Sequence, residues 1–240
     1  MREAVNTYLN TYNQFQLYGT PHVVSLLLFT ILVIWLPLYA RKLSPKVQDR
    51  IGAILGITVM LSYLSWPILE MIGGSFQKEL HLPFHLCRFA NLALPIVMLN
   101  KNYRMYEILF FWGLSGMLQG VLTPDIKEAF PHYHFIRFWL SHQLMIVALI
   151  YATVVYKMVP TLKSLWRGFI ALNLFLLITI PVNLILDANY FWICGKPPSA
   201  SLLDYMGPWP WYILTGEFVA LAHFSLAYLP VHIWQKFKKS

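Results

Sequence analysis

Cys87 and His142 are the two residues of this chain whose side chains best fit covalent chemistry. A thiol that loses its proton to an imidazole can attack an ester, and the imidazole can then return the proton to the leaving group. Arg88 directly follows the cysteine, and a positive charge beside a thiol favours its reactive thiolate form. We therefore expect Cys87 to be a nucleophile and His142 to be its general base.

Other polar residues are candidates for binding a substrate near this pair. Asn91 lies four residues after Cys87, so the two share one face of a helix. Arg88 is expected to steer a phosphate or to stabilise an oxyanion, and the asparagines and Gln119 are expected to donate hydrogen bonds. The candidate substrate-binding residues are His85, Arg88, Asn91, Gln119, Asp125, Asn183, Asp187, Asn189, Tyr190, Trp209, Tyr212 and Glu217.

Long apolar segments must position these residues. The chain of 240 residues is 58% hydrophobic and 12% charged, whereas a soluble domain is about 25% charged. A membrane-spanning helix needs about 20 mostly apolar residues. The sequence predicts seven such helices, at residues 22–40, 51–72, 84–99 (a short one), 105–122, 135–156, 168–186 and 211–234. The fold class predicted is an all-α bundle of seven transmembrane helices, in one domain covering residues 1–240.

The distribution of basic residues predicts the orientation of the bundle. Twelve Lys and Arg residues fall in the loops after the first, third and fifth predicted helices and in the tail, which contains Lys236, Lys238 and Lys239. Five fall on the opposite side. Because cytoplasmic loops carry the excess of positive charge, we expect the N-terminus outside and the C-terminus in the cytoplasm. The net charge of +8 thus indicates membrane topology rather than nucleic-acid binding.

The candidate residues share one depth in the predicted bundle. Helices that run in both directions carry their polar side chains in the outer half, while their inner halves are plainly apolar. Polar groups inside a membrane are costly and tend to line functional cavities. This pattern favours an outward-facing polar pocket over side chains that merely reach the headgroups. Cys87 could instead be an inert, buried cysteine.

Three other functions are compatible with the same residues. His85, His132, His134, His142 and Asp125 could in principle bind zinc, but their spacing fits no common zinc motif, so we expect no metal and no cofactor. Helix prolines, among them Pro67, Pro95, Pro181 and Pro230, could serve a transporter. A non-catalytic transporter or small-ligand-binding protein is the main alternative, and a structural protein is the third. We expect His223, the deepest histidine, to be satisfied within the bundle.

A family resemblance appears in these same segments. The stretch from His81 to Arg88, the Thr123-Pro124-Asp125 turn, the 130–134 segment, the 183–190 segment and the 207–212 segment resemble the signature of the YwaF-like family of bacterial integral membrane proteins. That family is similar to the eukaryotic transmembrane protein 164, an acyltransferase that remodels ether phospholipids, and more distantly to androgen-induced hydrolases of lipid esters. The resemblance implies a nucleophile at Cys87 and a base at His142.

Together these observations predict a membrane-embedded lipid acyltransferase or lipid-ester hydrolase. Its partners would be membrane lipids, as acyl donor or acceptor, and not nucleic acid. We expect a multi-pass protein of a bacterial plasma membrane. The expected mechanism needs Cys87 and His142 to meet beneath the outer surface of the bundle.

Overall fold

The computed structural model describes residues 1–197 and 201–237, which are helical apart from connecting segments and one isolated β-bridge between Gln14 and Glu128. Lys238 and Lys239 of the predicted basic tail lie outside the described residues. The α-helices are α1 (Arg2–Asn10), α2 (Thr20–Ala40), α3 (Pro45–Gly73), α4 (Lys78–His81), α5 (Leu86–Asn100), α6 (Tyr103–Trp112), α7 (Leu118–Leu122), α8 (Tyr133–Val154), α9 (Leu162–Leu186) and α10 (Trp211–Phe237). The remaining turns are a π segment, η1 (Gly113–Met117), and two 3-10 segments, η2 (Tyr190–Trp192) and η3 (Leu202–Tyr205).

Six helical stretches among the described residues are long and apolar enough to cross a membrane. They are α2, α3, the continuous run from α6 to α7, α8, α9 and α10. The third predicted span forms α5, which has only 15 residues. At about 1.5 Å per residue this helix is roughly 22 Å long, short of a hydrocarbon core of about 30 Å. Six of the seven predicted spans thus form helices long enough to cross a membrane, whereas a seventh span at α5 and the orientation of the termini stay predictions.

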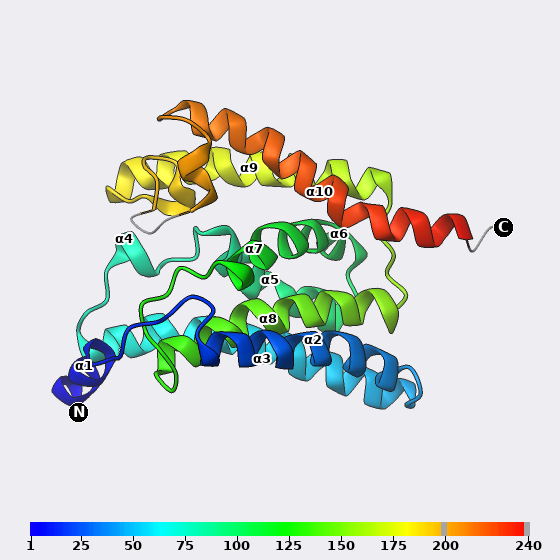
Figure 1. Ribbon diagram of the computed structural model, residues 1–240, viewed down its shortest axis with the longest axis horizontal. Helices are drawn as coiled ribbons and strands as arrows, with labels where there is room; N and C mark the ends of the chain where they lie inside the picture. Colours follow the sequence, from blue (N-terminus) through cyan, green and yellow to red (C-terminus); the bar gives the residue numbers. More distant parts are fainter. Residues whose placement is uncertain (198–200, 238–240) are drawn as a thin grey trace.

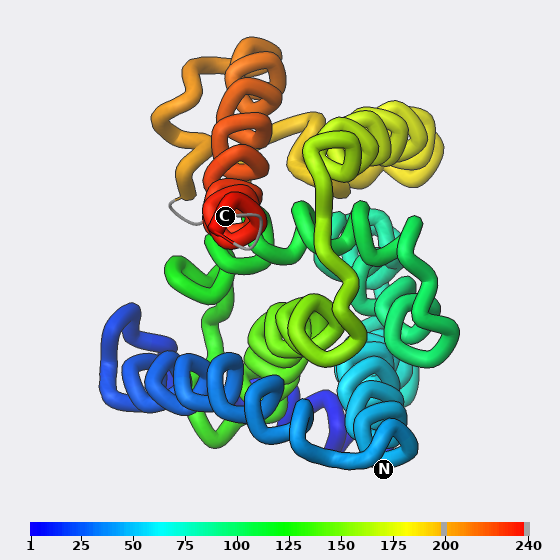
Figure 2. Tube along the Cα trace, turned by 90° about the vertical axis from the view of Figure 1, so that its right-hand side faces the viewer, coloured from blue at the N-terminus to red at the C-terminus, as the bar shows by residue number. Residues whose placement is uncertain are grey.

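Helix α8 lies in the middle of the bundle. It packs against α2, α3, α5, η1 and α7. In its most apolar stretch 72% of the residues are buried, against 11% in the corresponding stretches of α2 and of α10. Figure 1 shows the long helices running along one axis, with α9 and α10 above the α6–α7 run and with α2 and α3 below α8. The end-on view in Figure 2 separates the α9–α10 pair from the α2–α3 pair in the same way. Side chains on α8 are therefore the ones that neighbouring helices can shield from lipid.

Local sequence signals fix the ends of these helices. Proline occupies the first turn of α2 and of α3, where its missing N–H costs no hydrogen bond. Gly74 ends α3 in the left-handed conformation that suits glycine. Thr161 and Ser164 form a capping box at the start of α9, and the His132 ring accepts a hydrogen bond from the backbone N–H of His134 at the start of α8.

Small residues allow α3 and α5 to approach closely beneath the site. A Cβ on Gly56 would lie 2.9 Å from Cβ of Met98, closer than side-chain atoms pack. Close approach at glycine is the usual device for packing helices inside a membrane, where the hydrophobic effect does not draw helices together. The position of α5 against α3 is therefore set by the absence of a side chain at Gly56.

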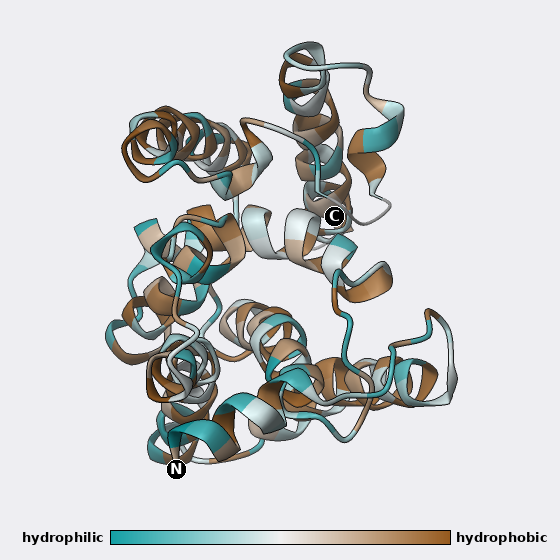
Figure 3. Cartoon of the chain, turned by 90° about the vertical axis from the view of Figure 1, so that its left-hand side faces the viewer, coloured by the Kyte–Doolittle hydropathy of each residue, from teal (hydrophilic) through white to brown (hydrophobic). Residues whose placement is uncertain are grey.

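Apolar side chains cover the outside of the bundle. Leu184 and Ile185 on α9 are 77% and 79% exposed, and Phe218 on α10 is 67% exposed. Figure 3 shows that hydrophobic colour follows the long helices, whereas α1 carries hydrophilic residues. Water would penalise such a surface and lipid does not, so the chain is a multi-pass integral membrane protein.

A buried ion pair joins α6 to α9. The Glu107 carboxylate is 1% exposed and accepts hydrogen bonds from Arg167 at 2.8 and 2.9 Å and from the Ser164 hydroxyl. Arg104 lies 3.4 Å away on the same helix as Glu107. The pair therefore holds the α9–α10 layer against the α6–α7 run.

Candidate functional site

Cys87 lies in the first turn of α5, half-buried and unbonded to the exposed Cys194. Its side chain packs against the main apolar core. Arg88 and Arg137 are close enough to interact electrostatically with its sulfur. The positive N-terminal end of α5 adds to this field. The two arginines and this helix end therefore offset part of the cost that burial places on a negative charge at the sulfur.

His142 is held on α8 in an orientation that leaves one ring nitrogen free. Its Nδ1 lies 3.0 Å from the Phe138 carbonyl oxygen and 2.9 Å from the Ser141 hydroxyl. A carbonyl can only accept, so Nδ1 carries the proton and Nε2 carries the lone pair. The ring stacks on Phe138 at 4.1 Å between centroids. His142 is therefore oriented as a base whose accepting nitrogen points away from its own helix.

Gly120 on α7 makes room beside that free nitrogen. A Cβ at this position would lie 3.4 Å from Cδ2 and 3.8 Å from Nε2 of His142. Any larger side chain would fill the space next to the base. The glycine keeps the edge of the ring open to a reacting group.

The two candidate catalytic residues belong to helices that pack directly on one another. Arg88 and Arg137 interact electrostatically with both Cys87 and His142, which makes the two arginines common neighbours of the pair. Within residues 1–197 and 201–237, His142 forms its hydrogen bonds with Phe138 and Ser141 rather than with the Cys87 sulfur. The direct Cys–His contact stays a prediction.

Two arginines from different helices meet on one tryptophan ring. The guanidinium carbons of Arg88 (α5) and Arg137 (α8) each lie 4.5 Å from the centroid of Trp66 on α3. Arg88 donates to the carbonyl oxygens of Leu80 and Leu82. In the described part of the chain, Nε of Arg137 is buried without a hydrogen-bond partner, and neither arginine forms a salt bridge.

Arg137 and Trp66 were not among the candidates predicted from the sequence. Arg137 lies five residues before His142 on α8, a spacing that puts the two side chains on different sides of a helix. A basic residue in a membrane helix without an acid at helical spacing was the signal that could have identified it. Two like charges held on one ring favour an anion between them.

A carboxylate lies on the far edge of the same tryptophan. Glu70 is 9% exposed and accepts hydrogen bonds from Trp66 Nε1 at 3.1 Å and from the Ser75 hydroxyl. Nε2 of His81 lies 3.9 Å from it, and Nε2 of His134 lies 3.7 Å from it. Burial lowers the pKa of His81, so its ring is neutral near pH 7. Within the described residues, no group of three or more His, Cys, Asp or Glu side chains has the geometry to hold a metal ion.

Several candidate substrate-binding residues hold the loop that follows α9. Asn183 bonds the N–H and the C=O of Tyr190 at 2.8 and 2.9 Å, and the Tyr190 hydroxyl bonds the backbone of Lys78 and Leu82. Asn189 bonds the backbone of the 194–195 turn. These hydrogen bonds hold the loop after α9 in place. A role for the same residues in binding substrate stays a prediction.

His85 also contacts this loop. Its ring lies 5.3 Å from the Tyr190 ring and 5.1 Å from the Trp192 ring, and its Nδ1 accepts from the Phe191 N–H at 3.4 Å. Burial, together with the positive charge of Arg88, holds the pKa of His85 well below its usual range. The ring is therefore neutral and serves as a hydrogen-bond acceptor.

Of the other candidates, some are exposed, one is buried in the core, and the rest line a cavity. Asp125 and Asp187 are exposed, and Trp209 is 62% exposed while its Nε1 donates to the Ile193 carbonyl. Asn91 is 2% exposed, and its Oδ1 has no partner among the described residues. A buried unpaired acceptor one turn after Cys87 is a feature that a bound substrate would explain.

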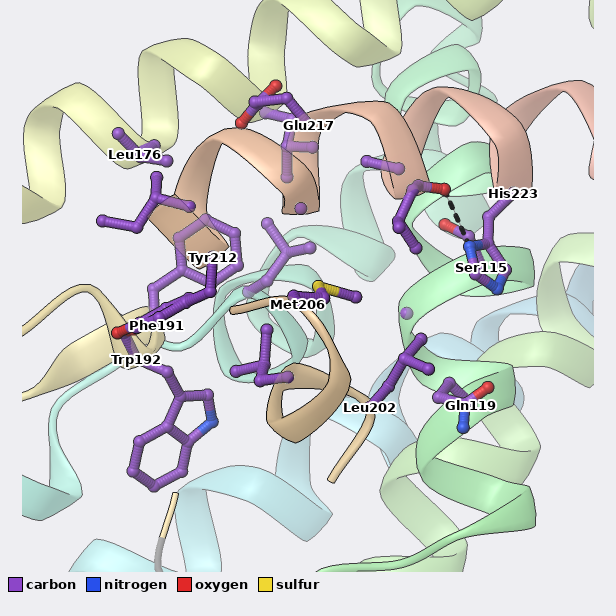
Figure 4. Close-up of a pocket in the computed structure, with 18 of the residues that line it drawn as sticks. Ser115, Gln119, Leu176, Phe191, Trp192, Leu202, Met206, Tyr212, Glu217 and His223 are labelled. Carbon is purple, nitrogen blue, oxygen red and sulfur yellow. Dashed lines mark hydrogen bonds between the residues drawn. The ribbon is translucent and has the colours of Figure 1, made fainter. Parts of the chain in front are cut away.

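The remaining candidates, Gln119, Tyr212 and Glu217, line a cavity of about 270 Å³ between η1, α7, α9, α10 and the η2–η3 loop. Figure 4 shows Ser115 and Gln119 on one side of this cavity and Phe191 and Trp192 on the other. Glu217 accepts a hydrogen bond from Asn173 at 2.9 Å. Nδ1 of His223 donates to the Val219 carbonyl at 2.8 Å, in agreement with the expected satisfied histidine.

Comparison with known proteins identifies relatives of the chain. The model of the TMEM164 family matches residues 17–228. An uncharacterized protein of Treponema pallidum (strain Nichols) is 26% identical over 170 residues, which cover 71% of this chain and 68% of that protein. No solved structure matches the chain.

Proposed function

The chain belongs to the TMEM164 family of membrane proteins, and we propose that it is a lipid acyltransferase or lipid-ester hydrolase in which Cys87 is the nucleophile and His142 the general base. The observation that carries this proposal is the shared neighbourhood of the two residues. A thiol at a helix N-terminus and an imidazole with a free Nε2 lie on helices that pack together, under the same two arginines.

The first half of the reaction forms an acyl-enzyme. Nε2 of His142 takes the thiol proton, and the Cys87 sulfur forms a bond to the ester carbonyl carbon. The carbonyl electron pair moves to its oxygen, and Arg88 supplies positive charge for that oxyanion, while Arg137 is left to bind the headgroup phosphate. When the oxyanion collapses, the bond to the alcohol oxygen breaks, and the alcohol leaves as a lysolipid with the proton from His142.

The second half releases the acyl group. An alcohol of another lipid gives its proton to His142 and attacks the thioester carbonyl, which regenerates the thiol and completes an acyl transfer. If water attacks instead, the same steps amount to hydrolysis. The apolar walls around Cys87 favour transfer, because they limit the access of water.

Purified protein in lipid nanodiscs tests the acyl-enzyme directly. Incubation with a phospholipid whose acyl chain carries an isotopic label is expected to add one acyl mass to the peptide that contains Cys87, and hydroxylamine is expected to remove it, because a thioester is cleaved under mild conditions. Acyl label found on another residue, or turnover of the lipid without label on Cys87, would contradict the mechanism.

The arginine pair leads to a prediction about headgroup recognition. Arg137→Gln removes one of the two charges on Trp66 and keeps a side chain of similar shape. We expect kcat/KM for a phospholipid ester to fall about 10- to 100-fold, since a hydrogen bond to a charged group contributes about 1.5–3 kcal/mol. The measurement is acyl release from matched phospholipid and diacylglycerol substrates.

The control for this prediction separates charge from packing. Arg137→Lys keeps the charge but loses the paired donors of the guanidinium, so it is expected to recover part of the activity. The diacylglycerol lacks a phosphate, so its turnover is expected to change less than twofold or so in Arg137→Gln. An equal loss on both substrates would assign Arg137 a purely structural role.

A further inference from the structure

The cavity beside the candidate site has a lining that suits an acyl chain better than a polar lipid headgroup. Leucine, isoleucine, valine, methionine and phenylalanine side chains make most of its wall, and the polar groups on it come from Ser115, Gln119, Trp192, Tyr212, Glu217 and His223. The carboxylate of Glu217 already accepts from Asn173, and Nδ1 of His223 already donates to a carbonyl. An apolar ligand is therefore what this cavity would bind.

The wall of the cavity includes residues that are next to the candidate site along the chain. Leu86 lines the cavity and is the residue before Cys87 on the chain. On the other side Gln119 lines it, and the next residue, Gly120, faces the His142 ring. An acyl group attached to the Cys87 sulfur would thus have its chain beside this opening.

Two glycines on facing elements leave the cavity open. Gly116 lies in the π segment η1 and Gly216 in α10, and both line the cavity. A Cβ added at either position would meet no atom within 4 Å. Elsewhere glycine permits close packing of helices, as at Gly56, but these two positions border empty space.

Resting on the proposed function, we infer that this cavity holds the acyl chain of the lipid ester and that Gly116 and Gly216 set the length of chain it accepts. The volume of about 270 Å³ holds roughly ten carbon atoms, because an apolar cavity of about 150 Å³ holds the six carbons of benzene. Longer chains extend from the cavity toward the lipid.

Leucine at one of these glycines tests the assignment by chain length. Gly216→Leu fills the cavity from α10, and leucine is a better helix former than glycine, so the variant is expected to fold. We expect kcat/KM for palmitoyl esters to fall about tenfold or more, since losing two methylene groups from an apolar site has that effect. Butyryl esters are expected to change less than about twofold, because a short chain does not reach the filled region.

The matched control is Ser225→Leu, which adds the same side chain to an exposed position of α10. Its kcat/KM values for the palmitoyl and butyryl esters are expected to equal those of the wild type. Equal losses of Gly216→Leu on short and long chains, or no loss on either, would overturn the inference.

A binding experiment separates this inference from the proposed chemistry. A decanoic acid analogue with a terminal diazirine, whose chain matches the length that the cavity holds, is photolysed with the Cys87→Ala protein in nanodiscs, and labelled peptides are identified by mass spectrometry. Label is expected on η3 and on the 211–224 part of α10, and Gly216→Leu is expected to abolish it. Label confined to lipid-facing residues, unchanged by Gly216→Leu, would overturn the cavity assignment even if the enzyme proves active. Cavity label without any turnover would instead count against the proposed function alone.

Discussion

Cys87→Ala is expected to abolish acyl transfer while leaving the bundle folded. Removal of the nucleophile eliminates the covalent route, so the rate should fall about a thousandfold or more, as when nucleophiles are removed from other covalent enzymes. Alanine and cysteine are both small, and the cysteine is only half-buried. The loss of stability should therefore be about 1 kcal/mol or less. Acyl release and thermal unfolding, measured on the same nanodisc preparation, give the two quantities.

The second cysteine supplies the control for this experiment. Cys194 is exposed and lies in the loop after α9. Cys194→Ala is expected to retain wild-type turnover and wild-type labelling by a thiol-directed acyl probe. If instead Cys87→Ala retained turnover, the chemistry would belong to other residues, and Ser115 in the cavity would be the next hydroxyl to test.

His142→Gln completes the comparison, because glutamine keeps a polar side chain but cannot take a proton. The thiol of this variant should react more slowly with both donors, an activated thioester and an ordinary ester, because the base that takes its proton is gone. The loss should be smaller with the thioester than with the ester, because the thioester's leaving group needs no protonation, and raising the pH should restore part of the thioester reaction by ionising the thiol. Equal losses on both donors that a higher pH does not relieve would indicate that His142 shapes the site rather than moving a proton.

The long helices could be predicted from sequence because each carries a strong local signal. The predicted span at 135–156 corresponds to α8 at Tyr133–Val154, and that at 211–234 corresponds to α10 at Trp211–Phe237. Apolar content alone identifies such segments. The same signal does not decide whether a short apolar helix such as α5 crosses the membrane, because composition does not reveal where a helix ends within it.

Features that depend on tertiary contacts could not be predicted in this way. The π segment η1 lies where Gly113 faces the Leu149 side chain on α8. No periodic pattern of apolar residues in the sequence predicts a π segment there. The meeting of Arg88 and Arg137 on Trp66 needs three helices to come together. The sequence shows each of these residues, but it does not show that the two arginines contact the same tryptophan ring.

Polar residues at helix ends were the least predictable in role. Asn183 and Asn189 were predicted to line an outer polar pocket, and both bond backbone groups of the loop after α9. Free backbone groups at a helix end and a bound ligand demand the same side chains. Position in the outer layer therefore selects both kinds of residue, and only the hydrogen-bond partners separate them.

Glu107→Ala is expected to destabilise the contact between α6 and α9. It leaves Arg167 without the two hydrogen bonds of 2.8 and 2.9 Å that now satisfy it at this contact. The loss is expected to be about 1.5–3 kcal/mol, the usual contribution of hydrogen bonds to a charged group, because the Arg167 side chain left behind is 41% exposed and stays partly solvated. Unfolding in mixed micelles of increasing SDS content measures the loss.

An exposed ion pair in the same protein provides the contrast. Asp49 and Lys101 lie 2.7 Å apart, with side chains 50% and 47% exposed. Asp49→Ala is expected to cost less than about 1 kcal/mol, because water already solvates both charges. Losses of equal size in Glu107→Ala and Asp49→Ala would refute the argument from burial.

The double substitution Glu107→Met with Arg167→Met separates the charge from the contact. It removes both partners and fills their volume with apolar atoms, so most of the lost stability should return. Because α9 and α10 form one side of the cavity, the single variant Glu107→Ala should also loosen the chain-length selectivity described above. The double variant should restore that selectivity together with stability, since the cavity needs α9 held against α6 and not the charges themselves.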